Sequence, residues 1–145
     1  RLRGPLRPAR RPACTSFHLL GLVFLPAAAV LGAALATMNG AFNAYGATYA
    51  FVFMMNCIIT IPAVLLSGLF LRWSGGEKSR WIAIAPMLVP VAIGSIWYIW
   101  RGLVPATVAP GAEYIGAPQY LIVALLGVTF IVLLLRVTGM VSRAD

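Results

Sequence analysis

The chain has 145 residues, of which 61% are hydrophobic and only 10% charged, and its mean hydropathy is +0.94. Soluble domains carry about 25% charged residues, so this composition indicates lipid as the solvent and argues against a soluble globular protein. The net charge is +8, but the basic residues lie at the ends of apolar runs rather than on one face with interleaved aromatic residues. We therefore expect no nucleic-acid partner and instead expect contacts with anionic lipids.

Residues 1–16 form a basic N-terminal arm without acidic residues, in which Arg7, Arg10 and Arg11 are candidate contacts for anionic lipid. The apolar run 17–37 that follows ends near Ala34-Leu35-Ala36, a pattern that also occurs at secretory cleavage sites. An acid-free basic arm is also typical of organelle transit peptides. The apolar run is long for a signal core, so we interpret it as an uncleaved first membrane helix.

Small residues recur every fourth position through this first helix and beyond it. Because small residues let membrane helices approach closely, this row predicts tight helix packing. The uncharged stretch 38–48 at its end contains Asn39 and Asn43, which are candidates for a polar lining, although a turn combined with a helix contact is the favoured interpretation. The residues of the row are Ala28, Gly32, Ala36, Gly40 and Ala44.

The second apolar run, 49–71, contains Asn56 about two turns from its start. An amide in lipid is costly unless it is hydrogen-bonded, so Asn56 is expected to face another helix or a polar cavity. Two interpretations remain open. Asn56 either bonds neighbouring helices together or lines a site for a ligand or permeant.

A short basic connection precedes the third apolar run, 81–100, and it holds Arg72, Lys78 and Arg80 as further candidate contacts for anionic lipid. Pro86 and Pro90 make the third run the least regular of the four, because each proline removes a backbone hydrogen bond and tends to kink its helix. Such kinks mark a gate or a cofactor niche in some proteins and are only a matter of shape in others.

The fourth apolar run is 119–139, and residues 140–145 form a short tail. Each run is close to the roughly 20 residues that cross the hydrocarbon core. We therefore predict an all-α, polytopic integral membrane protein, with one four-helix transmembrane domain over residues 17–139 and helices at about 17–37, 49–71, 81–100 and 119–139.

Ten of the eleven basic residues fall in the arm, the central connection and the C-terminal end, and Arg101 is the exception. With four crossings these three regions share one side, so the positive-inside rule predicts that both termini face the cytoplasm, or the matrix or stroma of an organelle. The expected location is the bacterial inner membrane, with an organelle inner membrane as the alternative.

The apolar runs offer little for catalysis. Two cysteines without a CxxC spacing and a single histidine do not make a metal site or a pair of haem ligands. We predict no catalytic, metal-binding or cofactor-binding residue, while a bound lipid or pigment stays open. The acidic residues all lie outside the four runs, at Glu77, Glu113 and Asp145.

Three features favour a small non-catalytic structural or accessory subunit of a larger membrane complex. The interior of the apolar runs contains no charged groups, the first helix has a flat face of small residues, and the loops are short. Other integral membrane subunits would then be its partners, in a hetero-oligomer rather than a homo-oligomer. The first alternative is a small oligomeric channel or transporter for a neutral or small solute. The second is a membrane-embedded enzyme or lipid-binding protein in which Glu113, Tyr114 and the asparagines supply the polar groups.

Overall fold

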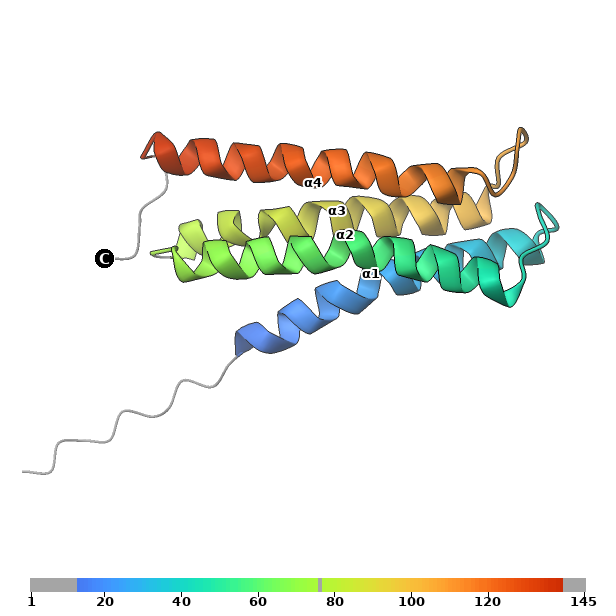
Figure 1. Ribbon diagram of the computed structural model, residues 1–145, viewed down its shortest axis with the longest axis horizontal. Coiled ribbons are helices and arrows are strands. Elements are labelled where there is room, and N and C mark those ends of the chain that lie inside the picture. The colour runs from blue at the N-terminus through green and yellow to red at the C-terminus, as the bar shows by residue number, and fades with distance from the viewer. Residues whose placement is uncertain (1–12, 76, 140–145) are drawn as a thin grey trace, which may run out of the picture.

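The computed structural model describes residues 13–75 and 77–139, and all regular structure in these ranges is α-helical (Figure 1). Arg7, Arg10 and Arg11 lie outside the described residues, as do most of the predicted arm and the tail. All four helices are long and apolar enough to cross a membrane, which confirms the predicted all-helical bundle and supports a multi-pass membrane protein. The helices are α1 (Ala13–Met38), α2 (Gly46–Arg72), α3 (Glu77–Leu103) and α4 (Glu113–Val137).

The helices extend beyond the apolar runs that predicted them. α2 begins at Gly46 instead of Tyr49, and α4 begins at Glu113 instead of Gln119. An apolar run marks only the part of a helix that suits hydrocarbon, whereas the helix itself continues through the interface, where polar surroundings satisfy its end groups. Pro118, expected in the loop, therefore lies inside α4.

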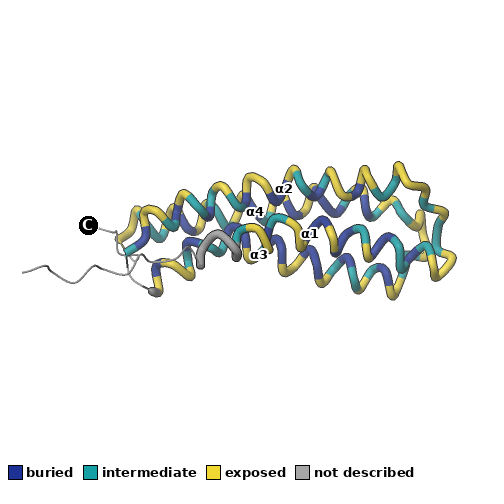
Figure 2. The backbone as a smooth tube through the Cα atoms, turned by 90° about the horizontal axis from the view of Figure 1, so that it is seen from below, coloured by how far each residue is buried: buried dark blue, intermediate teal, exposed yellow. Residues whose placement is uncertain are grey.

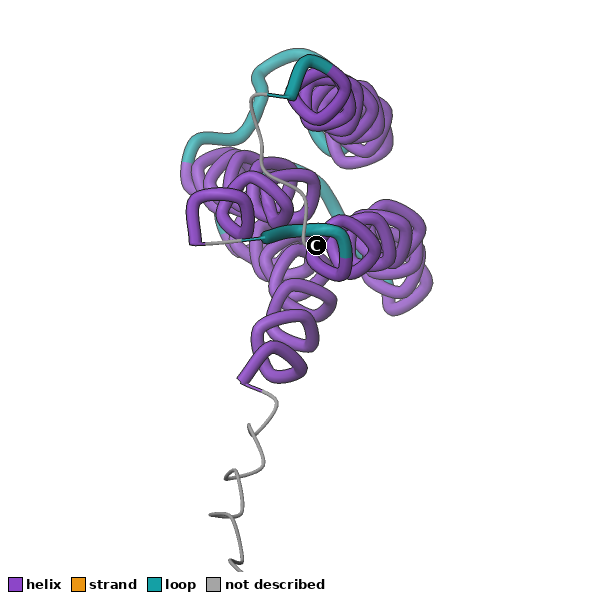
Figure 3. The backbone as a smooth tube through the Cα atoms, turned by 90° about the vertical axis from the view of Figure 1, so that its left-hand side faces the viewer, coloured by secondary structure: helices purple, strands orange, loops and turns teal. Residues whose placement is uncertain are grey.

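The chain runs up and down, so α1 and α3 are parallel to each other and antiparallel to α2 and α4 (Figure 1). We call the end with residues 39–45 and 104–112 the distal end, and the end with residues 73–75 the proximal end. α2 and α3 each pack against the other three helices, and α3 makes the more extensive contacts with α1 and α4. α4 packs against α3 and, less extensively, α2, and it lies on the opposite side from the start of α1 (Figure 3).

The apolar core follows the inward sides of the helices, as the burial pattern of Figure 2 shows. Its members come from all four helices and include Leu25, Ala33, Ile59, Met87 and Leu125, each at most 5% exposed. Small residues on α1 allow α3 to come close to it. A Cβ atom on Gly32 would collide with the Tyr98 carbonyl oxygen of α3, so the two backbones are in direct contact there.

The predicted small-residue row is divided by the end of α1. Ala28, Gly32 and Ala36 are buried inside the bundle, whereas Gly40 is exposed with a φ of 71°, a left-handed conformation that ends the helix. The Ala41 amide donates to the Ala36 carbonyl at 3.0 Å and closes this cap. Gly40 and Ala44 consequently belong to the turn and do not extend the packing face of α1.

α3 is one α-helix from Glu77 to Leu103 although it contains Pro86 and Pro90, and a side chain of α2 bonds to its backbone beside Pro86. Ser67 accepts a hydrogen bond at 3.1 Å from the backbone amide of Met87, the residue after Pro86. Ser67 is fully buried, so this bond satisfies two polar groups in an apolar environment. Pro86 here contributes to the contact between α2 and α3.

Candidate functional site

Three buried polar side chains from three helices meet in the distal half of the bundle. They are Asn56 of α2, Tyr98 of α3 and Tyr114 of α4, and we call them the distal polar cluster. Asn56 and Tyr98 are 0% exposed and Tyr114 is 2% exposed. Tyr98 lies beside Asn56, and the two tyrosines lie close enough to interact electrostatically.

Each member of the cluster carries an unsatisfied polar atom. The Asn56 Oδ1 atom and the hydroxyls of Tyr98 and Tyr114 have no partner at hydrogen-bonding geometry within the described part of the chain. The Asn56 Nδ2 atom is partly used, because it donates to the Val52 carbonyl at 2.9 Å. Buried polar atoms are nearly always paired in folded proteins, so three such atoms in one place call for a further hydrogen-bonding partner, such as water or a ligand.

Aromatic rings hold the two tyrosines in position. The rings of Tyr98 and Tyr114 stack at a centroid distance of 5.8 Å and an interplanar angle of 19°. Trp97 meets both rings edge-on, with centroids 5.2 Å from Tyr98 and 6.4 Å from Tyr114. Phe42, from the turn after α1, lies 5.8 Å from Tyr114. Such pairs contribute roughly 0.5–1.5 kcal/mol each beyond burial, so they fix the directions of the hydroxyl groups.

An ion pair joins the distal ends of α3 and α4. The Arg101 Nε atom lies 3.6 Å from the Glu113 Oε1 atom, and the Ala106 amide donates to the same oxygen at 3.4 Å. Arg101 also donates to the Val104 carbonyl at 3.3 Å and lies over the ring of Trp100. Neighbouring groups therefore compensate both charges. The ion pair links the two ends of the loop between α3 and α4.

The three asparagines predicted as a polar lining are not brought together. Asn39 donates from Nδ2 to the Gly102 carbonyl at 3.0 Å and thereby caps the C-terminal end of α3. Asn43 is exposed in the turn. Asn56 alone lies inside the bundle, in the distal polar cluster.

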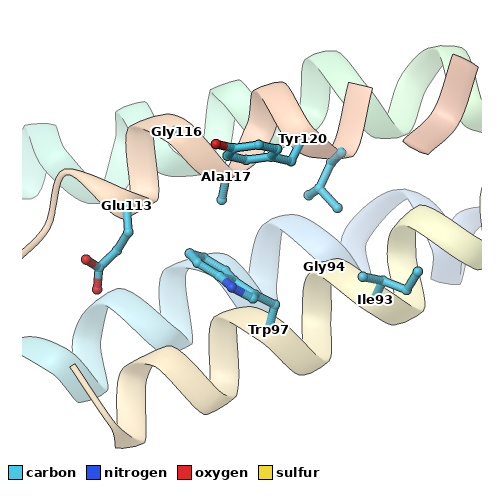
Figure 4. Close-up of a pocket in the computed structure, with 8 residues that line it drawn as sticks. Ile93, Gly94, Trp97, Glu113, Gly116, Ala117 and Tyr120 are labelled. Atoms are coloured by element: carbon cyan, nitrogen blue, oxygen red, sulfur yellow. The ribbon is translucent and has the colours of Figure 1, made fainter. Parts of the chain in front are cut away.

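A small apolar cavity of about 240 Å³ opens between α3 and α4 (Figure 4). Its lining includes the small residues Gly94, Gly116 and Ala117. A Cβ atom on Gly116 would meet nothing within 4 Å, whereas one on Gly94 would meet the side chains of Leu25 and Leu121. The ring of Trp97 lies between the two helices, and the carboxylate of Glu113 lies at one end of the cavity (Figure 4). The remaining lining residues are Ile93, Tyr120 and Leu121.

A larger groove of about 570 Å³ lies over the first turns of α2 and α4. Tyr114 and Val52 line it, so the groove adjoins the distal polar cluster, in which Asn56 lies one helical turn after Val52. Phe42, Phe51 and Ile115 add apolar surface, and Asn43 and Thr48 add polar groups at its rim. We call this hollow the distal groove.

At the proximal end, Arg72, Lys78 and Arg80 are all exposed, as contacts with lipid head groups require. Arg136 has a different role. Its Nη2 atom donates to the Phe70 carbonyl and to the Ser74 hydroxyl, both at 2.7 Å, so that α4 caps the C-terminal end of α2.

The sequence points to Tyr114 only as one polar group of the enzyme or lipid-binding alternative, and it singles out neither Tyr98 nor Arg136. The period of the apolar pattern gives no direction for these side chains, since all sides of such helices are apolar. Asn56 is the residue by which the sequence indicates the cluster, because a lone amide within an apolar run requires a hydrogen-bonding partner.

The distal polar cluster offers amide and hydroxyl groups and no carboxylate, imidazole or ammonium group. The described residues also contain no group of three or more histidine, cysteine or acidic side chains able to hold a metal ion. The arrangement suits recognition of a neutral polar group by hydrogen bonds. No protein-family model matches the sequence, and comparisons with curated proteins and with solved structures found no match.

Proposed function

We propose that the chain is a small non-catalytic subunit of a larger integral membrane assembly, and that α4 provides the surface on which a partner subunit packs. The observation that carries this proposal is the low burial of α4 within its own chain. The most apolar part of α4 is only 17% buried, whereas the corresponding parts of the other helices are 33–44% buried.

The free face of α4 combines large apolar side chains with a glycine. A Cβ atom on Gly127 would meet nothing within 4 Å, so a partner helix has room to approach the backbone closely there. Around this position the face is apolar and well exposed, which suits contact with another membrane helix. Its exposed members include Val123, Leu126, Phe130, Ile131 and Leu134.

The roles of the charged and polar side chains support a structural protein. Arg101 and Glu113 pair with each other, and Arg136 caps α2. Asn39 caps α3. These side chains stabilise helix ends, and proton or ion transport would instead use ionisable groups in the interior of the bundle.

The charge distribution supports an orientation. Arg72, Lys78, Arg80 and Arg136 lie at the proximal end, and Arg101 lies at the distal end. By the positive-inside rule the proximal end faces the cytoplasm, in the inner membrane of a bacterium, or the matrix or stroma if the membrane belongs to an organelle. The exposed basic residues then contact anionic lipids of that leaflet.

Purification of the tagged chain from its native membrane in a mild detergent tests the proposal. We expect other integral membrane chains to co-purify at fixed stoichiometry. Gly127→Leu should abolish this co-purification and leave the chain folded, because the new side chain projects outward from α4. Gly68→Leu on α2, where a Cβ also meets nothing within 4 Å, is the matched control and should retain the partners. Isolation of the wild-type chain only as a monomer or homo-oligomer would refute the proposal.

A further inference from the structure

The distal groove and the distal polar cluster adjoin each other, because Tyr114 belongs to both. It lines the groove together with Val52, and its hydroxyl is one of the three unpaired polar atoms of the cluster. A molecule in the groove therefore lies against Tyr114, which is a member of the cluster. The groove has the size of typical small-molecule sites, which occupy about 300–1,000 Å³.

The atoms of the cluster define the chemistry of a matching group. The Asn56 Oδ1 atom only accepts hydrogen bonds, while a tyrosine hydroxyl both donates and accepts. A hydroxyl group on a ligand could donate to one of these atoms and accept from another. Leaving such atoms buried without partners is costly, so a ligand that pairs with them gains free energy on binding.

The charge and polarity of the lining exclude an ionic head group. Neither the cluster nor the groove contains a charged side chain. Glu113, one residue before Tyr114, is already paired with Arg101. An anion or cation in the cluster would be buried without a counter-charge, which is far more costly than burying a hydroxyl.

We propose that the distal groove binds a neutral amphiphile with a hydroxyl head group, a class that includes long-chain alcohols and acylglycerols. The hydroxyl pairs with the distal polar cluster, and the hydrocarbon chain lies along the apolar part of the groove formed by Phe42, Phe51 and Ile115. This site is formed within one chain, so the inference stands independently of any partner subunit on α4.

Photolabelling of the purified full chain in detergent tests the inference. The probe is a hexadecanol analogue that carries a diazirine and an alkyne, and its methyl ether is the matched probe that cannot donate a hydrogen bond. We expect saturable labelling by the alcohol, mapped to peptides from the starts of α2 and α4, and about tenfold weaker labelling by the ether. Unlabelled diacylglycerol should compete with the alcohol, and palmitate should not.

Tyr114→Phe removes the hydroxyl but retains the stacked ring, and it should weaken labelling by the alcohol about tenfold without affecting labelling by the ether. Tyr120→Phe is the matched control, since Tyr120 is 79% exposed on the same helix, and it should label like the wild type. Hexadecanol should also raise the melting temperature of the wild type more than that of Tyr114→Phe. Equal labelling by alcohol and ether, or wild-type labelling of Tyr114→Phe, would show that the three polar atoms have only a packing role and would overturn the inference.

Discussion

At the scale of single residues, two glycines determine how closely α1 and α3 approach. A Cβ atom on Gly32 would collide with the Tyr98 carbonyl oxygen, and one on Gly102 would lie 2.6 Å from the Gly32 carbonyl oxygen. Gly32→Ala must therefore push the helices apart. We expect it to lower the free energy of unfolding by about 1–3 kcal/mol, as overpacking does in other cores, measured by titrating the micelle-bound protein with SDS.

Gly68→Ala provides the control for this substitution. A Cβ at Gly68 meets nothing within 4 Å, so this change should leave stability unchanged or raise it slightly, because alanine favours the helix over glycine. If Gly32→Ala unfolded at the same SDS fraction as Gly68→Ala, the close contact between α1 and α3 would be disproved.

At the scale of elements, α4 is attached to α2 at the proximal end by Arg136. Its guanidinium bonds to the Phe70 carbonyl and the Ser74 hydroxyl and lies over the Phe70 ring at 5.3 Å. Arg136→Met should lower the free energy of unfolding by about 1.5–3 kcal/mol, the usual loss for hydrogen bonds to a charged group. Hydrogen–deuterium exchange should then rise in the last turns of α2 and α4.

Arg80→Met is the comparison for this effect, since Arg80 is exposed on α3. Its exchange rates and stability should match those of the wild type within about 0.5 kcal/mol, as for most surface substitutions. Unchanged exchange in Arg136→Met would mean that packing alone holds the proximal ends together.

At the scale of the whole molecule, the charge distribution predicts which end of the bundle is cytoplasmic. Cysteines introduced singly at Lys78 and Val108, with Cys14 and Cys57 replaced by serine, report on the proximal and distal ends. In intact bacterial cells a membrane-impermeant maleimide should label Val108→Cys, which is highly exposed. It should label Lys78→Cys only after the membrane is permeabilised. Labelling in the opposite order would reverse the proposed orientation.

The existence and number of the helices could be predicted from the sequence because apolar length alone defines a membrane span. Their ends could not, since Gly46 and Glu113 begin α2 and α4 outside the apolar runs. The row from Ala28 to Ala44 keeps a four-residue spacing and would drift slowly around an ideal helix, but the left-handed backbone of Gly40 ends α1 within it. The regular spacing of small residues cannot show where α1 ends, because Gly40, which ends the helix, is itself one of the regularly spaced residues.

The candidate site was less predictable still. Asn56 could be singled out because an amide in an apolar run requires a partner. Its proximity to Tyr98 and Tyr114 depends on the rotations of three helices about their axes, and helices that are apolar on all sides do not encode these rotations in their periodicity. The tyrosines consequently resemble ordinary interfacial aromatics until the packing of the helices is known.

The contact between Gly32 and Gly102 has a consequence for biogenesis. The contact joins the C-terminal third of α1 to the last turn of α3, so it cannot form until nearly all of α3 has been synthesised. During insertion α1 and α2 are therefore in the membrane as a hairpin before α3 is complete. Until then lipid or an insertion factor covers the small residues of α1. A ribosome-bound chain that ends just after α3 can form the three-helix core, and α4 then packs onto it.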